Sequence, residues 1–442
     1  MIDTDAHRVQ TGPGGAITSE LSLDLWWWGE DEAPGLGSWL ERVCNAFEAS
    51  HGVHVKLSLL RHTEVLPGFP AAFAAGQAPD LHFFWNGIYV MESVWSGQVA
   101  PLDGLLDPGE LLAIGGGAQS KWEGTTYRVG WYVIPVVWVA NRTVLARAGV
   151  GSLPATWEDF LAACERVRAD GGRPITAGDG EGDFSIWWLT HFLTQELDSA
   201  GDAARLVFGE LDWRSARYYS PWLRLEQVRD AGFLDREALP LTLWEGLARF
   251  NEGGSAFTIA SGPMFAACRS ALGDGATVQV APAAGVGRLA SLPIVDTQGL
   301  GLSSSSRNKE AAAGLLQHLH EPEQRRSLWE EVRLFPADGR WAGPEADAPA
   351  DYRRMWEWWA GGPSAPYVPN LLPLPMHYRL AELGQAVLAG EIDGLRAGAL
   401  AYAAAAEWVA ADAGRAERYR SWVREVAAEE AGLTPLNQPG ED

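Results

Sequence analysis

The segment Leu21-Ser-Leu-Asp-Leu-Trp-Trp-Trp28 alternates apolar and polar side chains and then becomes wholly apolar. This pattern is typical of a β-strand that enters a sheet covered on both faces. The same periodicities predict the elements that follow: strands at 53–60 and 79–85, and helices at 39–50, 67–76 and 88–98. The order β-α-β-α-β-α favours an α/β layer built on a parallel sheet.

The remainder of the chain is predicted to be mainly helical, with a few short strands. Thr156 is expected to cap a helix that begins at Trp157, because its hydroxyl can accept a hydrogen bond from a free backbone N–H. Apolar periodicity predicts the other elements: helices at 185–198, 215–230, 242–252 and 309–320, at least two helices within 379–428, and strands at 257–260, 278–282 and 299–303.

Composition restricts the classes of function. The chain has 442 residues, and its 34 Lys+Arg against 57 Asp+Glu give a formal net charge of −23. Such an acidic chain is poorly suited to nucleic acids and anionic membranes, so we expect neither as a partner. The length favours two domains. No run of about 18 apolar residues that would insert into a membrane occurs in the sequence.

The sequence contains none of the common short motifs of catalytic or metal-binding sites that we considered. The cysteines Cys44, Cys164 and Cys268 are far apart and odd in number, so we expect buried free thiols. Zinc-hydrolase, esterase-elbow and P-loop motifs do not occur. The acidic run Glu30-Asp-Glu32 could pair carboxyl groups for glycoside cleavage, but adjacency alone does not support that chemistry. We therefore predict no catalytic residue, no metal and no cofactor.

Several segments in one consistent order carry a resemblance to a known family. Two of them are Ala72-Phe-Ala-Ala-Gly-Gln-Ala-Pro-Asp-Leu81 and Leu153-Pro-Ala-Thr-Trp-Glu-Asp-Phe160. The others are residues 23–29, 47–55, 122–130, 137–145, 250–263, 306–312 and 367–373. Together they resemble the bacterial extracellular solute-binding proteins that deliver sugars to ABC importers, a family that includes the maltose-binding proteins.

This resemblance implies a two-lobe α/β fold of the periplasmic-binding-protein type (type II), with discontinuous lobes, a hinge and a ligand cleft between the lobes. We expect the first lobe at 21–138 plus 296–342 and the second, helix-rich lobe at 143–292 plus 345–430. Residues 1–20 and 431–442 are expected to be tails. The hinge is expected near 139–142 and 293–298.

A site for a sugar combines flat aromatic rings with short polar groups, because a sugar has apolar C–H faces and a rim of hydroxyls. Candidate contacts follow predicted strands or lie where the family places ligand contacts. In the first lobe they are Trp28, Glu30, Asp31, Trp85, Asn86, Trp131 and Tyr132; in the second they are Asp183, Phe184, Trp187, Ser261, Met264, His377 and Tyr378. For each candidate there is an alternative: the aromatic residues pack in the core, and the acids are solvated at the surface. Trp187 and Trp188 cannot face the same way on a helix, so one of them is expected in the core.

The resemblance implies a non-enzymatic protein that binds a mono- or oligosaccharide, or a polyol, and closes around it by hinge motion. Its expected partners are the carbohydrate and the transmembrane subunits of an ABC permease, and we expect a monomer. The expected location is extracellular, at the cell surface or in the periplasm, after removal of an export signal that this sequence does not contain. The alternative is a cytoplasmic protein with an enzymatic or sensing role on a sugar-like metabolite. A strongly anionic ligand is disfavoured, although the charge of the cleft decides this point.

Overall fold

The computed structural model describes residues 21–432 of the chain. The expected tails, 1–20 and 431–442, lie outside these residues, except that 431 and 432 belong to the last helix. In the part that the structure describes, no helix combines the length and apolar character needed to cross a membrane.

The first elements confirm the predicted β-α-β-α-β-α order. They are β1 (Leu21–Trp27), α1 (Leu36–His51), β2 (Val53–Leu59), α2 (His62–Ala74), β3 (Leu81–Phe84) and α3 (Ile88–Trp95). β1 lies between β2 and β3 and is parallel to both. Helix α2 begins five residues before the predicted start at Pro67, because the Glu64 side chain accepts a hydrogen bond of 3.0 Å from the Arg61 backbone N–H and fixes the first turn there.

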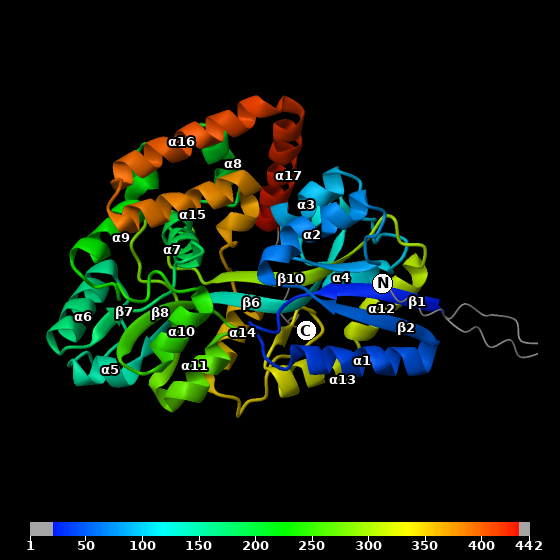
Figure 1. Cartoon of the computed structure of the whole chain (residues 1–442), viewed down its shortest axis with the longest axis horizontal. Coiled ribbons are helices and arrows are strands. Elements are labelled where there is room, and N and C mark those ends of the chain that lie inside the picture. The colour runs from blue at the N-terminus through cyan, green and yellow to red at the C-terminus, as the bar shows by residue number, and fades with distance from the viewer. Residues whose placement is uncertain (1–20, 433–442) are drawn as a thin grey trace, which may run out of the picture.

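Two long antiparallel strands, β6 (Arg128–Asn141) and β10 (Ile294–Leu302), cross the middle of the molecule (Figure 1). The sheet has the order β2-β1-β3-β10-β6-β8-β7, in which β8 spans Ser255–Ser261 and β7 spans Arg173–Ile175. Two further strands, β9 (Ala276–Gln279) and β11 (Phe335–Pro336), also pair with β6. β6 pairs with β10 along 128–136 and with β8 (Ser255–Ser261) along 136–140. One strand thus connects the elements at the two ends of the sheet.

These two ends form two lobes. The N-lobe contains β1–β3 and α1–α3, together with α4 (Pro108–Ile114), η1 (Ala118–Ser120), β4 (Lys121–Trp122), β5 (Thr125–Thr126), α12 (Lys309–Leu319), α13 (Pro322–Ser327) and η3 (Leu328–Val332). The C-lobe contains β8 together with α5 (Arg142–Arg147), α6 (Trp157–Ala169), β7 (Arg173–Ile175), α7 (Asp183–Thr194), α8 (Gly201–Val207), α9 (Ala216–Asp230), α10 (Leu243–Asn251), α11 (Phe265–Leu272), η2 (Gly273–Gly275), β9 (Ala276–Gln279), α14 (Ala350–Ala360), η4 (Val368–Leu371), α15 (Leu374–Ala389) and α16 (Gly394–Ala411). Since β6 and β10 take part in both, the residue boundaries expected for the lobes stay a prediction.

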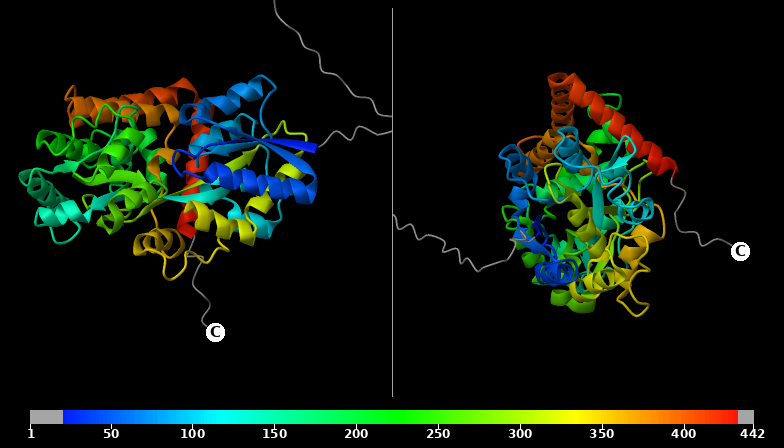
Figure 2. Two further views of the ribbon diagram at one scale, coloured as in Figure 1. Left: turned by 60° about the horizontal axis from the view of Figure 1, so that its bottom comes forward. Right: turned by 90° about the vertical axis from the view of Figure 1, so that its right-hand side faces the viewer.

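The last helix, α17 (Ala413–Gly432), leaves the C-lobe and runs across to the N-lobe (Figures 1 and 2). Lys121 of β4 and Glu429 of α17 form an ion pair of 2.6 Å. The rings of Trp95 and Trp422 pack edge to face with centroids 6.1 Å apart. The C-terminal helix therefore holds the lobes together on one side of the molecule.

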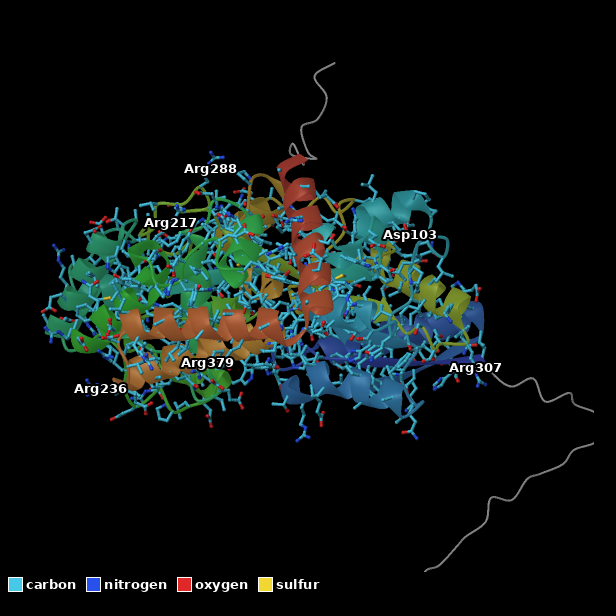
Figure 3. All side chains as sticks on the ribbon, turned by 90° about the horizontal axis from the view of Figure 1, so that it is seen from above. Asp103, Arg217, Arg236, Arg288, Arg307 and Arg379 are labelled. Carbon is cyan, nitrogen blue, oxygen red and sulfur yellow. The ribbon has the colours of Figure 1, made fainter. Side chains whose placement is uncertain are left out.

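Charged side chains lie on the outside of both lobes. Figure 3 places Arg236 and Arg379 at the periphery of the C-lobe and Arg307 at that of the N-lobe. The ion pairs of the surface join residues such as Arg147 and Asp170, with 2.5 Å between Nε and Oδ2. Pairs as exposed as this one contribute little to stability.

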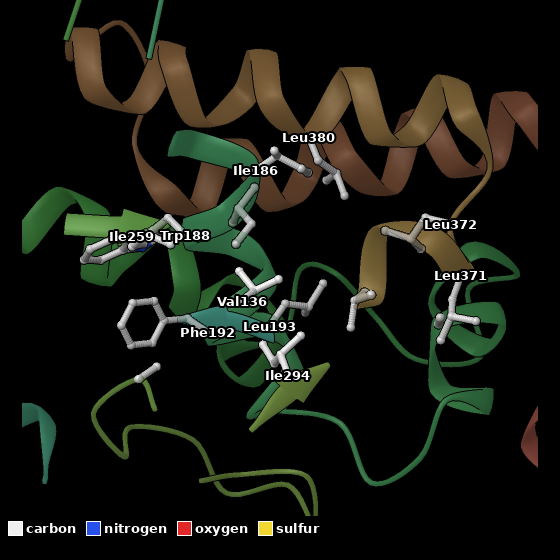
Figure 4. Packing of buried hydrophobic residues seen from close by; sticks show 14 of the residues in the cluster. Val136, Ile186, Trp188, Phe192, Leu193, Ile259, Ile294, Leu371, Leu372 and Leu380 are labelled. Atoms are coloured by element: carbon white, nitrogen blue, oxygen red, sulfur yellow. The ribbon is translucent and has the colours of Figure 1, made fainter. Parts of the chain in front are cut away.

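The core is rich in aromatic residues and passes between the lobes. In the C-lobe, the ring of Trp188 lies 4.6 Å from that of Phe192, beside Ile259 (Figure 4). The three cysteines are buried and free, as predicted. The Thr156 hydroxyl accepts a hydrogen bond of 3.1 Å from the backbone N–H of Asp159, which confirms the predicted helix cap.

Candidate functional site

A cavity of about 390 Å³ lies between the lobes, within the size range of small-molecule sites. It is lined by residues from the ends of β1 and β3, from α2 and α3, and from β6, α7, α10, β10 and α15. Segments more than 300 residues apart in sequence thus share one cavity: Trp28 lines it together with His377 and Tyr378.

The N-lobe contributes a group of aromatic rings. Trp28 and Trp85 follow the neighbouring parallel strands β1 and β3, and the carboxyl ends of parallel strands meet at one edge of a sheet. Their ring centroids are 5.8 Å apart at an interplanar angle of 65°. His62, at the start of α2, lies 5.6 Å from Trp28 and 5.1 Å from Trp85, and Tyr89 of α3 lies 5.6 Å from Trp85.

Helix α7 of the C-lobe presents one face to the cavity. Asp183, Ile186 and Trp187 line it, and positions three and four residues apart share a face of a helix. Trp188 points the other way: it is fully buried, and its indole N–H donates a hydrogen bond of 3.0 Å to the carbonyl of Pro221. This division of the two tryptophans agrees with the sequence-based expectation.

Glu32, which lines the cavity, connects the N-lobe to the C-lobe through a hydrogen bond. Its Oε1 accepts a hydrogen bond of 2.5 Å from the hydroxyl of Ser261, at the end of strand β8. Its Oε2 is buried and has no partner among the described residues. Burial raises the pKa of this carboxyl from 4.5 to about 7, because the ionised form loses its hydration.

Asp296 of β10 is a second buried carboxyl that lines the cavity. It accepts a hydrogen bond of 3.1 Å from the side-chain amide of Asn86. Burial raises the pKa of Asp296, although the nearby charge of Arg128 and the amide hydrogen bond act in the opposite direction. Arg128 does not line the cavity; it is fully buried and donates to the backbone carbonyl of Phe84 over 3.1 Å.

Near the C-terminal end of the chain, helix α15 places His377 in contact with Tyr89 of α3. Its Nδ1 lies within hydrogen-bond distance, 3.1 Å, of Tyr89 Oη. Burial lowers the pKa of His377 to about 4, so its imidazole is neutral at physiological pH. Like the bond between Ser261 and Glu32, this contact connects the two lobes.

Half of the residues that the sequence singled out line the cavity. These are Trp28, Trp85, Asp183, Trp187, Met264, His377 and Tyr378. Two others support lining residues from behind: Asn86 binds Asp296, and Ser261 binds Glu32.

The other five lie away from the cavity. Glu30 closes its own loop by accepting hydrogen bonds from the backbone N–H groups of Gly35 and Gly37, and Asp31 is exposed beside it. Trp131, Tyr132 and Phe184 are buried in the cores. β6 is covered on both faces, so both members of the Trp131-Tyr132 pair pack inside, whichever way they point. We therefore leave these five out of the proposed site.

The structure adds lining residues that the sequence reasoning did not select. The main ones are Glu32, His62, Tyr89, Glu181, Trp244, Asp296, Gln298, Tyr367 and Asn370. Asp296 and Gln298 had a usable signal: two polar residues at alternate positions of a predominantly apolar strand. His62 and Trp244 had none, because only the packing of the lobes brings them together.

The fold and the interlobe cavity are those of a two-lobed binding protein. Residues 31–326 match the family described as "Bacterial extracellular solute-binding protein", and the chain belongs to this family. It is thus a solute-binding protein of the kind that serves ABC transporters, a non-catalytic class. A comparison with curated proteins finds no match.

Solved structures agree with this fold. A chitin oligosaccharide binding protein superimposes with a TM-score of 0.79 at 22% identity, over 88% of this chain and 99% of that one. A protein from Caldanaerobius polysaccharolyticus, described with xylan utilization, gives a TM-score of 0.77 at 17% identity, over 86% and 99%. The GacH receptor of Streptomyces glaucescens, solved unliganded and with acarbose, gives 0.69 at 17% identity, over 91% and 98%. At these identities the likeness supports the fold alone.

Proposed function

We propose that this chain is the substrate-binding component of a carbohydrate importer and holds a mono- or oligosaccharide, or a polyol, in the interlobe cavity. One observation carries the proposal: Trp28, Trp85 and Trp187 line the same cavity as the carboxyl groups of Glu32, Asp183 and Asp296. Indole rings stack on the C–H faces of a sugar, and carboxylate oxygens accept hydrogen bonds from its hydroxyls. Three similar structures carry names or descriptions that refer to chitin oligosaccharide, xylan and acarbose.

Closure of the lobes couples binding to transport in this proposal. The hinge lies at 139–142 and 293–298, at the end of β6 and the start of β10. A ligand that contacts both lobes stabilises the closed arrangement, because only that arrangement offers all of its contacts. The closed form then docks on the transmembrane subunits of an ABC permease, from the extracellular or periplasmic side, as a monomer.

A thermal-shift screen against mono-, di- and oligosaccharides and polyols tests the proposal. A ligand that binds the folded chain alone raises its stability by RT ln(1 + [L]/Kd), about 2.7 kcal/mol at a concentration of 100 Kd. The ligand that shifts the midpoint most is then incubated with the protein and recovered. The proposal predicts a shift from at least one carbohydrate, which is recovered chemically unchanged; a screen with no carbohydrate shift, or an altered sugar, contradicts it.

A tryptophan variant shows whether the ligand occupies this cavity. Trp85→Ala removes a lining ring from the carboxyl end of β3 and is expected to abolish most of the shift. Trp138→Phe is the control, since Trp138 is buried and does not line the cavity. The control variant lowers the unliganded midpoint but keeps the shift on adding ligand.

A further inference from the structure

The groups that line the cavity carry charge of one sign. Four carboxyl groups line it, those of Glu32, Glu181, Asp183 and Asp296, and neither Lys nor Arg occurs among the described lining residues. The labelled arginines in Figure 3, such as Arg236 and Arg288, lie on the outside of the molecule instead. The cleft is therefore acidic, like the chain as a whole.

Arg128 balances one of these carboxyl groups. It lies behind the cavity wall, and its charge acts on Asp296 from there. Glu32 and Asp183 have no such partner, because no Lys or Arg in residues 21–432 acts on either carboxyl. The nearest basic group to act on Asp183 is the imidazole of His62, across the cavity in the other lobe.

Glu32 shows most directly that the cavity lacks a cation. The residue is only 6% exposed, and among the described residues Oε2 has no hydrogen-bond donor. An ionised carboxylate is costly to bury without a partner. A ligand that brings a positive charge into the cavity beside this carboxyl would reduce the cost, whereas a second anion would increase it.

The aromatic rings of the N-lobe form a corner and not a flat platform. The angles between Trp28, His62 and Trp85 are 58°, 59° and 65°, and the three centroids lie within 5.8 Å of one another. The three rings pack against one another and line the cavity, and the faces of indole rings attract cations.

A metal ion does not fit these groups. In the part of the chain that the structure describes, no group of three or more His, Cys, Asp or Glu side chains is placed to hold a metal. The four carboxyl groups come from separate segments: the loop after β1, the loop before α7, the first turn of α7, and β10. Acceptors that do not form a metal-binding group suit an organic cation that also carries hydroxyls.

We infer that the ligand is an aminated carbohydrate, such as an amino sugar or its oligomer, whose protonated nitrogen is held by the acidic and aromatic lining of the cavity. This inference rests on the proposed function and specifies its substrate class. The carboxyl groups supply the counter-charge, the rings of Trp28, His62 and Trp85 provide an aromatic wall beside the cation, and Trp187 contacts the sugar ring.

Related sugars that differ in the charge of one substituent test the inference. Calorimetric titrations would compare glucosamine with glucose, N-acetylglucosamine and glucuronic acid, and the chitosan disaccharide with its neutral N,N′-diacetyl form. The amine of each pair is expected to bind at least about 10-fold more tightly than its neutral counterpart, with the sugar acid weakest. Raising the salt concentration should weaken the amines more than the neutral sugars.

A variant that neutralises one carboxyl of the cavity tests whether the preference for amines arises there. Asp183→Asn is expected to lower the affinity for the amines about 10-fold and to change that for neutral sugars less than about 2-fold. Asp159→Asn is the matched control, because Asp159 also lies in the first turn of a helix, α6, but is exposed and outside the cavity. The control is expected to leave all affinities unchanged.

Three other results of these titrations would each contradict a different part of the proposal. Neutral sugars or sugar acids that bind as tightly as the amines contradict the inference and leave the proposed function standing. A preference for amines that Asp183→Asn and Glu32→Gln leave intact contradicts the assignment to these carboxyl groups. A chain that binds none of the carbohydrates of any charge contradicts the proposed function itself.

Discussion

Ser261 and Glu32, which are 229 positions apart in sequence, share a hydrogen bond of 2.5 Å that crosses from the C-lobe to the N-lobe. Ser261 ends β8, and Glu32 lies in the loop after β1. Any opening of the lobes at this point must separate the two residues. Burial raises the pKa of the Glu32 carboxyl and this hydrogen bond lowers it; the net value is about 7.

Glu32→Gln is expected to change how stability depends on pH. Burial raises the pKa of Glu32 from 4.5 to about 7, so between these values the folded chain binds more protons than the unfolded chain. Its contribution to the free energy of unfolding is therefore greatest below pH 4.5 and falls as the pH rises to about 7. Relative to the wild type, the variant should gain on the order of 1 to 3 kcal/mol between pH 5 and pH 8, measured by urea unfolding.

Ser261→Ala is expected to strengthen the pH dependence of stability that Glu32→Gln removes. Losing the hydroxyl removes a hydrogen bond that lowers the Glu32 pKa, so the decline in stability should extend to higher pH. Identical pH profiles for the wild type and both variants would show that Glu32 is not a buried, proton-binding group.

The neighbouring tryptophans of α7 are expected to have opposite roles. Trp187→Ala removes a ring from the cavity and should weaken carbohydrate binding by about 1 to 2 kcal/mol, roughly 10-fold, with a small change in thermal midpoint. Trp188→Ala leaves a void in the core and should cost about 3 to 5 kcal/mol of stability. Calorimetry and denaturant unfolding of both variants check this; a Trp187→Ala protein with full affinity would remove Trp187 from the site.

Helix α17 is expected to stabilise the molecule through apolar packing and not through its ion pair. The pair of Lys121 and Glu429 is about one-third exposed on each side, so Lys121→Met should cost less than about 1 kcal/mol. Trp422 is fully buried against Trp95, and Trp422→Ala should cost about 3 to 5 kcal/mol. Equal losses in the two variants, measured by urea unfolding, would contradict this division.

Local patterns in the sequence predicted most of the fold. The alternation of residues 21–28 and the helical spacing of 39–50 reflect burial on one side of an element, which nearby residues reveal. The start of α2 was predicted wrongly, because Pro67 resembles a first helical residue, whereas the helix begins at His62 and continues through this proline.

The sequence identified a cavity residue only where that residue follows the end of a predicted strand or lies on a definite face of a predicted helix. Trp28 and Trp85 follow parallel strands, and Trp187 shares a helix face with Asp183. Trp131 and Tyr132 misled the prediction because a central strand buries both of its faces, so that alternation does not distinguish cavity from core. His62 and Trp244 depend on contacts between segments distant in sequence.

A crystal structure of the chain with the carbohydrate that gives the largest thermal shift shows directly where the ligand binds. We predict a sugar in the interlobe cavity, in contact with Trp85 of the N-lobe and Trp187 of the C-lobe, with its polar groups at Glu32 and Asp183. A sugar bound outside this cavity, or one that touches a single lobe, would contradict it.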